Sequence, residues 1–182
     1  MNRRGMLDAV IAGGGVVGAA TALMLAREGL QVALVEPKRP DAWRHDARDL
    51  RVYAFAPDNA QLLDELGVWP QIAAARAQPY RGMRVWDAAG GDALSFDADA
   101  LGQRQLGWIV ENALLVDALW QALPAAGVRV HCPARIESLE QTESGVRLQL
   151  DVGLALEAKF AIAADGAYDT RVCHQKLLDR PA

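Results

Sequence analysis

Hydrophobic and polar positions near the start of the chain follow a strand, helix, strand order. Residues 7–12 form a short and almost wholly apolar segment, which is typical of a strand buried on both faces. Residues 16–27 are rich in Ala and Leu, and Gly29 stands where a helix commonly ends. A second apolar run, 31–36, is closed by Pro37. The pattern predicts a βαβ unit with parallel strands and a right-handed crossover.

The remaining pattern predicts strands of two kinds, helices and one charged loop. We expect a charged surface loop over 40–51, a helix that Asp58 caps with Gln61 and Gly67 ends, a hairpin over 83–96 in a different sheet, a helix that begins at Asn112 and ends near Pro124 and Gly127, a strand over 128–132, an antiparallel meander over 135–152, and a buried parallel strand over 160–164.

Composition narrows the class of protein. The 182 residues are 52% hydrophobic and suffice for one main domain. The net charge of -4, with 19 scattered Lys and Arg residues, argues against nucleic-acid binding. Two cysteines, Cys132 and Cys173, without a CxxC pair argue against zinc and disulfides and fit a reducing cytosol. Glycines interrupt the first apolar run well before membrane-spanning length, so we expect a soluble protein.

The strongest candidate for chemistry is a glycine-rich turn between the first strand and the first helix. Gly13, Gly14, Gly15, Val16, Val17 and Gly18 form a G-x-G-x-x-G motif. We expect the first glycine to permit a tight turn, the second to admit a diphosphate, and the third to let helix and strand pack closely. The diphosphate would meet the free amides and the positive end of the helix dipole.

An acidic residue ends the second strand, where this motif usually has one. Glu36, followed by Pro37, can accept hydrogen bonds from ribose hydroxyls and would repel a 2′-phosphate. The site therefore favours FAD or NAD over NADP. The motif alone does not separate FAD from NAD.

Five sequence blocks, in order, resemble the flavin hydroxylases of ubiquinone biosynthesis, relatives of para-hydroxybenzoate hydroxylase. The blocks are DLRVYA (49–54), LLDELGVW (62–69), VWD (85–87), LGWIVEN (106–112) and ADG (164–166). With the glycine motif they cover residues 7–167. The resemblance implies an α/β, Rossmann-like, doubly wound FAD-binding sheet with an antiparallel meander and the start of a substrate-binding sheet. The FAD-binding domain would comprise 1–79 and 107–182, and 80–106 would begin the substrate-binding domain.

The resemblance also implies further cofactor-binding residues. Arg51 would approach the ribose and diphosphate, and Asn112 would lie near the flavin. Alternatives from the residues alone are a surface ion pair of Arg51 with Asp49 or Asp46, and a helix N-cap at Asn112.

Two more positions follow from the ends of strands. Asp165 and Gly166 would close a strand beside the cofactor, although Asp-Gly is also a common turn. Cys132 ends the third parallel strand, where the backbone would face the adenine, while the side chains of Cys132 and His131 are expected to pack. We expect no catalytic side chain and no metal ligand in this segment.

The function implied by the resemblance is FAD-dependent hydroxylation of a polyprenylated phenol or quinol, with NAD(P)H and O2 as co-substrates. The small aromatic substrate of this family is hydrophobic. The resemblance therefore implies a cytosolic protein that associates peripherally with the inner membrane or with a biosynthetic complex. Asp169 and Arg171 depart from the family pattern, and the chain stops where a family member is half complete. We therefore expect a truncated amino-terminal fragment that is inactive alone. The alternatives are an NAD- or FAD-binding oxidoreductase of other chemistry and a non-catalytic remnant.

Overall fold

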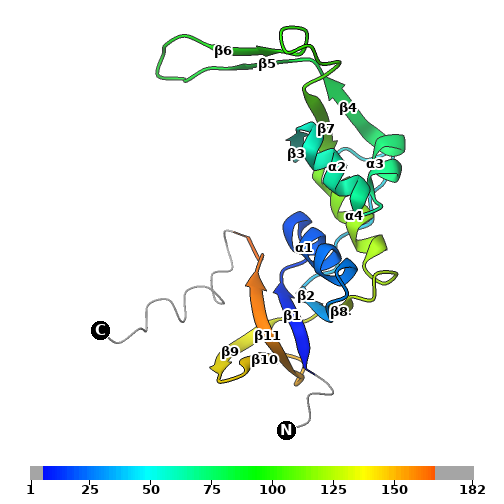
Figure 1. Cartoon of the computed structure of the whole chain (residues 1–182), viewed down its shortest axis with the longest axis vertical. Helices are drawn as coiled ribbons and strands as arrows, with labels where there is room; N and C mark the ends of the chain where they lie inside the picture. Colours follow the sequence, from blue (N-terminus) through cyan, green and yellow to red (C-terminus); the bar gives the residue numbers. More distant parts are fainter. Residues whose placement is uncertain (1–5, 167–182) are drawn as a thin grey trace. The chain divides into compact units, whose positions relative to one another are not determined.

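The computed structural model describes residues 6–166, whose contacts divide the chain into two compact units (Figure 1). The first unit comprises Met1–Asp41 and Val116–Ala182, and the second comprises Ala42–Leu115. The boundaries differ from the domain bounds expected from the sequence, and the function of each domain stays a prediction. Asp169, Arg171 and Cys173 lie outside the described residues.

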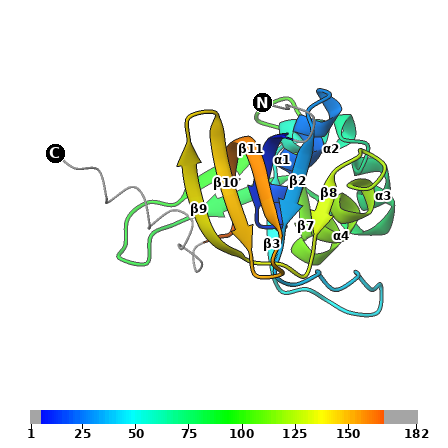
Figure 2. The same cartoon turned by 90° about the horizontal axis from the view of Figure 1, so that it is seen from below.

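The first unit is built on a single six-stranded sheet, whose strands lie side by side in Figure 2. Its elements are β1 (Leu7–Ala12), α1 (Val16–Arg27), β2 (Val32–Val35), β8 (Arg129–His131), β9 (Ile136–Thr142), β10 (Gly145–Leu150) and β11 (Ala155–Ala163). Helix α4 (Asn112–Ala122) begins in the second unit and ends in the first.

The strand order β8-β2-β1-β11-β10-β9 combines parallel and antiparallel pairing. Strand β1 is parallel to β2 and β11, and β2 is parallel to β8. Strands β9, β10 and β11 form an antiparallel meander. The predicted βαβ unit, third parallel strand and meander are confirmed. Strand β11 is longer than the expected 160–164, and its first half pairs with β10 and its second half with β1. The burial expected for 160–164 is wrong, since Phe160 is 39% exposed.

The core of the first unit explains why its first strand and helix form. Ala9, Val10 and Ile11 are completely buried, as expected for a strand covered on both faces. Helix α1 buries Gly18, Ala19, Ala22 and Leu23, and Gly29 adopts a φ of 83° just beyond the helix end. The connection between β1 and α1 is therefore anchored at both ends.

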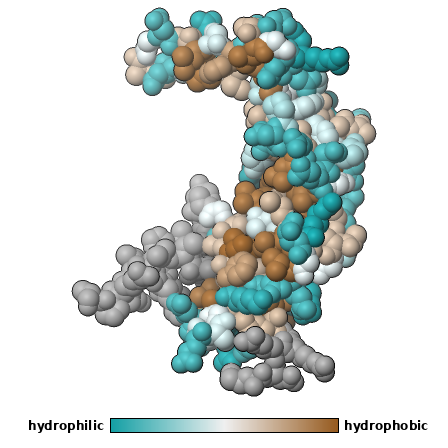
Figure 3. All heavy atoms as spheres, in the orientation of Figure 1, coloured by the Kyte–Doolittle hydropathy of each residue, from teal (hydrophilic) through white to brown (hydrophobic). Residues whose placement is uncertain are grey.

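The second unit contains two small antiparallel sheets and two helices. Its elements are β3 (Val52–Phe55), α2 (Pro57–Glu65), α3 (Trp69–Arg76), β4 (Ala77–Tyr80), β5 (Gly82–Val85), β6 (Leu94–Asp97) and β7 (Gly107–Glu111). One sheet has the order β3-β7-β4, and β5 pairs with β6 in the other. The hairpin and its separate sheet are thus confirmed. The hairpin exposes apolar side chains (Figure 3), namely Val85, Trp86, Leu94 and Phe96.

The start of α2 corrects one prediction. Its N-cap is Ala56 rather than Asp58, and no side chain caps it. Pro57 takes the first helical position, where its fixed φ suits a helix and its missing N–H costs nothing. The carboxylate of Asp58 accepts a hydrogen bond from the amide of Asn59 instead. Gly67 ends the helix with a φ of 78°, as predicted.

Candidate cofactor site

The turn between β1 and α1 requires glycine at its first position. Gly13 has a φ of 104°, which L side chains rarely adopt. A Cβ atom there would lie 2.5 Å from the carbonyl oxygen of Ala164, at the end of β11. The tight turn expected of Gly13 is therefore present, and the neighbouring strand leaves no room for a side chain.

The third glycine of the motif lets the helix sit directly on the turn. A Cβ on Gly18 would lie 2.0 Å from the carbonyl oxygen of Gly13. Close packing of α1 against the strand, expected from the sequence, thus depends on this glycine.

Gly15 differs from the other two because the space around it is open. A Cβ there would meet no atom within 4 Å, and Gly15 is the N-cap of α1 without any side-chain cap. Val16 and Val17 follow in the first turn, and Val17 is 70% exposed. The start of α1 therefore borders open space at Gly15 and Val17, and a diphosphate would need such space beside the free amides of a helix N-terminus.

The middle glycine is held from two sides. The amide of Gly14 donates a 2.6 Å hydrogen bond to Oε2 of Glu36, and Nε1 of Trp120 donates a 2.7 Å hydrogen bond to the Gly14 carbonyl oxygen. A Cβ on Gly14 would lie 2.5 Å from the Trp120 ring. Sequence reasoning missed Trp120, because a residue 106 positions away in an apolar helix gives no local signal.

Glu36 both supports the turn and faces a pocket. Its other carboxylate oxygen, Oε1, accepts a 3.2 Å hydrogen bond from the amide of Lys38. A carboxylate offers about four acceptor positions, so about two stay open for hydroxyl donors. The half-buried side chain is thus able to bind a diol while it holds Gly14.

The pocket has a volume of about 410 Å³ and lies at the carboxyl ends of β1 and β2. In doubly wound sheets this edge is where nucleotides bind. Of the predicted site residues, Gly13, Glu36, Pro37 and Asp165 line it. Other lining residues were not predicted, since they come from the segment before β9, the start of β9 and the turn between β10 and β11: Ala134, Arg135, Ile136, Glu137 and Asp151.

Two predicted positions lie at the margins of this pocket. Cys132 follows β8 and is two residues before Ala134, which lines the pocket. Burial, then the charge of Glu36, raises the pKa of the Cys132 thiol, which suits a packing residue. Gly166 is exposed, with a φ of 81°, beside the pocket-lining Asp165.

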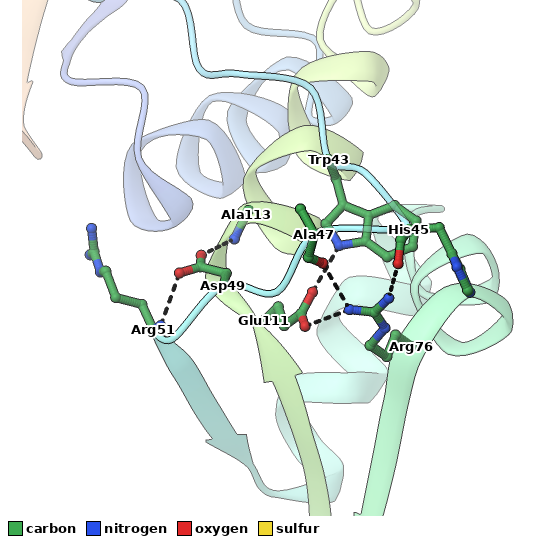
Figure 4. Close-up of polar contacts among 8 residues, drawn as sticks. All are labelled: Trp43, His45, Ala47, Asp49, Arg51, Arg76, Glu111 and Ala113. Atoms are coloured by element: carbon green, nitrogen blue, oxygen red, sulfur yellow. Dashed lines mark hydrogen bonds and ion pairs between the residues drawn. The ribbon is translucent and has the colours of Figure 1, made fainter.

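Arg51 and Asn112 belong to the second unit, where their backbones are bonded. The amide of Asn112 donates to the carbonyl oxygen of Arg51 at 2.8 Å. Asp49 accepts hydrogen bonds from the amides of Arg51 and Ala113, both at 2.9 Å, and the guanidinium of Arg51 points away from it (Figure 4). The Arg51 amide is the largest cause of the lowered pKa of Asp49.

These contacts bear on the two alternatives left open by the sequence, a surface ion pair of Arg51 and a helix N-cap at Asn112. Asp46 pairs with Arg44 at 2.6 Å, so it is not the ionic partner of Arg51. Asp49, rather than Asn112, accepts the Ala113 amide in the first turn of α4. Asn112 Oδ1 lies 3.4 Å from the Tyr53 hydroxyl. The cofactor contacts of Arg51 and Asn112 stay predictions.

Within residues 6–166, no group of three or more His, Cys, Asp or Glu side chains is arranged to hold a metal ion. Over the same residues, no helix has the length and apolar character needed to cross a membrane.

The glycine turn, its acidic partner and the pocket are typical of the class of nucleotide-binding α/β domains. Comparison with known proteins identifies the family within this class. Residues 6–175 match the family described as an FAD binding domain. The chain therefore belongs to this family of FAD-binding domains, and the predicted cofactor, FAD, is confirmed at the level of the family.

Curated relatives include the 3-demethoxyubiquinol 3-hydroxylase of Escherichia coli, 38% identical over 162 residues, which are 88% of this chain and 41% of that protein. The Xenopus tropicalis ubiquinone biosynthesis monooxygenase COQ6 is 33% identical over 175 residues, with 87% of this chain and 37% of that protein covered. The chain thus spans about two fifths of the length of these relatives.

Solved structures confirm the predicted fold class. The p-nitrophenol 4-monooxygenase PnpA from Pseudomonas putida DLL-E4 gives a TM-score of 0.70 at 24% identity, over 91% of this chain and 42% of that one. The flavin-dependent monooxygenase PieE, solved with FAD and substrate, gives a TM-score of 0.70 at 22% identity, over 90% of this chain and 31% of that one. At these identities the likeness concerns the fold.

Proposed function

We propose that this chain forms the FAD-binding part of a flavin-dependent hydroxylase that acts on a prenylated phenol or quinol in ubiquinone biosynthesis. The observation that carries the proposal is the open glycine turn beside Glu36, with Gly13 and Glu36 lining a pocket. The identity of the substrate class rests on the 38% identity to a 3-demethoxyubiquinol 3-hydroxylase.

In this proposal the glycine turn binds the FAD diphosphate. The amides of Gly15, Val16 and Val17 would donate to it at the positive end of α1, where an anion is stabilised and where the space beside Gly15 is open. Gly13 and Gly18 bring strand and helix close enough to set this geometry. Gly14 is engaged by Glu36 and Trp120, so its role is to hold the turn in shape.

Residues in the pocket and at its margins would bind the adenosine. Glu36 would accept hydrogen bonds from the ribose hydroxyls, with Pro37 beside it, and the backbone at Cys132 would face the adenine. Asp165 and Gly166 would close the site from the end of β11. A 2′-phosphate would be repelled by the Glu36 carboxylate.

We further propose that Arg51 contacts the diphosphate through its guanidinium and that Asn112 contributes a polar group near the flavin. When bound, FAD supplies the redox chemistry, with a nicotinamide cofactor as reductant and O2 as oxidant. The part of this chain is to bind and orient the cofactor. The prenyl tail of such a substrate partitions into lipid, so the proposal includes delivery of a small aromatic substrate at a membrane surface.

A binding experiment tests the cofactor site. The full chain is titrated separately with FAD, FMN and NAD, and flavin fluorescence or calorimetry gives the dissociation constants. We expect FAD to bind more tightly than FMN, which lacks the adenosine half, and ADP to compete with FAD. Glu36→Gln should weaken FAD binding about tenfold, the equivalent of one lost hydrogen bond to a charged group. Glu28→Gln, at the exposed far end of α1, is the matched control.

The outcome that contradicts the site is FMN binding as tightly as FAD, with affinity unchanged by Glu36→Gln. Tight binding of NAD without FAD binding would instead support an oxidoreductase of other chemistry.

A chimera tests the substrate class. Residues 6–175 replace the matching part of the Escherichia coli 3-demethoxyubiquinol 3-hydroxylase in cells that lack it, and ubiquinone is measured. We expect the chimera to restore ubiquinone and the chimera carrying Glu36→Ala to fail. A chimera that binds FAD but never restores ubiquinone would contradict the assigned substrate class and leave the FAD site standing.

A further inference from the structure

Glu111, at the end of β7, is a buried charged residue with both carboxylate oxygens engaged (Figure 4). Oε1 lies 2.7 Å from Nη1 of Arg76, and Oε2 accepts a 2.9 Å hydrogen bond from Nε1 of Trp43. The side chains of Arg76 and Glu111 are only 18% and 9% exposed. An ion pair so shielded from water is costly to break on one side only, because the other charge is left unpaired.

Arg76 extends the effect of this pair to the loop that precedes β3. Its Nη1 donates to the carbonyl oxygen of Ala47 at 3.2 Å, and its Nη2 donates to that of His45. Its guanidinium also lies 5.2 Å from the centre of the Trp43 ring. Three positions of the loop are therefore held by one ion pair, although the loop has no helix or strand of its own.

The far end of the same loop is held by Asp49, which bonds the amides of Arg51 and Ala113. Ala113 is only two residues beyond Glu111. The segment 43–51 is therefore fixed at both ends to one short stretch of chain, the junction of β7 and α4. The Arg51 side chain, in contrast, is exposed, and its guanidinium points away from these hydrogen bonds (Figure 4).

The charge on Glu111 is maintained by its partners. Burial acts to raise the pKa of this carboxyl, but hydrogen bonds from Trp43 and Arg76, with the charges of Arg76 and Arg48, outweigh it and lower the pKa. The carboxylate thus stays ionised near neutral pH and keeps Arg76 in place.

We propose that Glu111 is a positioning residue for FAD binding: through Arg76 and Trp43 it holds segment 43–51 so that Arg51 is presented to the cofactor. The inference rests on the role of Arg51 in the proposed function. Glu111 itself is not assigned a cofactor contact, because its side chain is buried against Trp43 and Arg76. Its contribution is to order segment 43–51 before the cofactor binds. The entropic cost of ordering this segment is then not part of the free energy of binding.

A double-mutant cycle tests this role in the full chain. The FAD dissociation constant is measured for the parent, Arg51→Ala, Glu111→Ala and the double variant. We expect each single substitution to weaken binding, Arg51→Ala by about tenfold. In the Arg51→Ala background, Glu111→Ala should weaken binding further by less than about twofold, because it acts through Arg51. Glu111→Gln keeps an acceptor for Trp43, so it should retain part of the affinity and serves if Glu111→Ala folds poorly.

Two further measurements separate positioning from general stability. Cleavage by trypsin at Arg44 and Arg48, inside the held segment, should be faster in Glu111→Ala than in the parent and unchanged in Arg51→Ala. Leu63→Ala removes a buried side chain from α2 in the same unit and touches none of these contacts. This control should lower the unfolding midpoint and leave the FAD dissociation constant within about twofold.

Additive effects of Arg51→Ala and Glu111→Ala, or trypsin cleavage unaltered by Glu111→Ala, would overturn the inference. If Arg51→Ala leaves FAD affinity unchanged while Glu36→Gln lowers it, the positioning role fails and the proposed FAD site stands. If neither substitution alters FAD affinity, the proposed site fails as well.

Discussion

Replacing Gly15 by alanine should separate cofactor binding from folding. Gly15 has φ and ψ of -68° and -174°, which alanine adopts without strain, and no atom lies within 4 Å of a Cβ placed there. The new methyl group would therefore disturb nothing in the folded chain. It would stand in the open space where the diphosphate is proposed to approach the first amides of α1.

The structure sets the expected magnitudes. Alanine is a poorer N-cap than glycine by about 0.5 kcal/mol. Its smaller unfolded-state entropy offsets this by about 0.4–1 kcal/mol, so stability should change by less than about 0.5 kcal/mol. For FAD, the loss of one amide bond to a charged phosphate oxygen costs about 1.5–3 kcal/mol, which weakens binding by about 10- to 150-fold.

The assay pairs urea unfolding with an FAD titration followed by flavin fluorescence. Gly29→Ala is the matched control, because it changes a glycine at the other end of α1. Its φ of 83° makes alanine unfavourable by about 1 kcal/mol, but no effect on FAD is expected. If Gly15→Ala binds FAD as tightly as the parent, the diphosphate does not approach this amide and the reasoning is wrong.

Three further predictions concern stability. Trp120→Phe removes the donor to the Gly14 carbonyl oxygen and should lower the free energy of unfolding by about 1–3 kcal/mol in urea; an unchanged value would contradict that bond. The pKa of Asp49 is lowered, first by the Arg51 amide, so its stabilisation is present above its unfolded pKa and is lost as pH falls through the folded value. Asp49→Asn should thus lose less stability than the parent on acidification below about pH 4, and equal losses in acid titrations would refute this. Ile72→Ala, completely buried in α3, should cost about 2–5 kcal/mol by calorimetry; a cost below about 1 kcal/mol would mean that α3 is not packed as described.

The part of the site that depends on local chemistry could be predicted from the sequence. The spacing of Gly13, Gly15 and Gly18 between a buried strand and a helix specifies a backbone turn, and the structure gives Gly13 and Gly18 a steric reason while it leaves open space at Gly15. Glu36 could be predicted because the end of the second strand lies beside that turn in any βαβ unit. Each of these inferences needs only neighbours within one supersecondary unit.

Contacts between distant segments could not be predicted. Trp120 gives no local sign that its indole bonds to Gly14, and the two partners of Glu111, Trp43 and Arg76, come from two separate segments. The sheet β3-β7-β4 was missed for a related reason, because its strands are short and distant in sequence, and β3 is largely exposed. Such short and exposed strands do not show a clear alternation of polar and apolar residues.

The bond between Trp120 and Gly14 also gives the candidate site an optical reporter. The indole is 7% exposed, and its nitrogen bonds directly to the glycine turn. Bound isoalloxazine absorbs in the region where tryptophan emits, so ligand capture should dim this emission by energy transfer. Subtracting the spectrum of Trp120→Phe isolates this indole from the other four tryptophans of the chain.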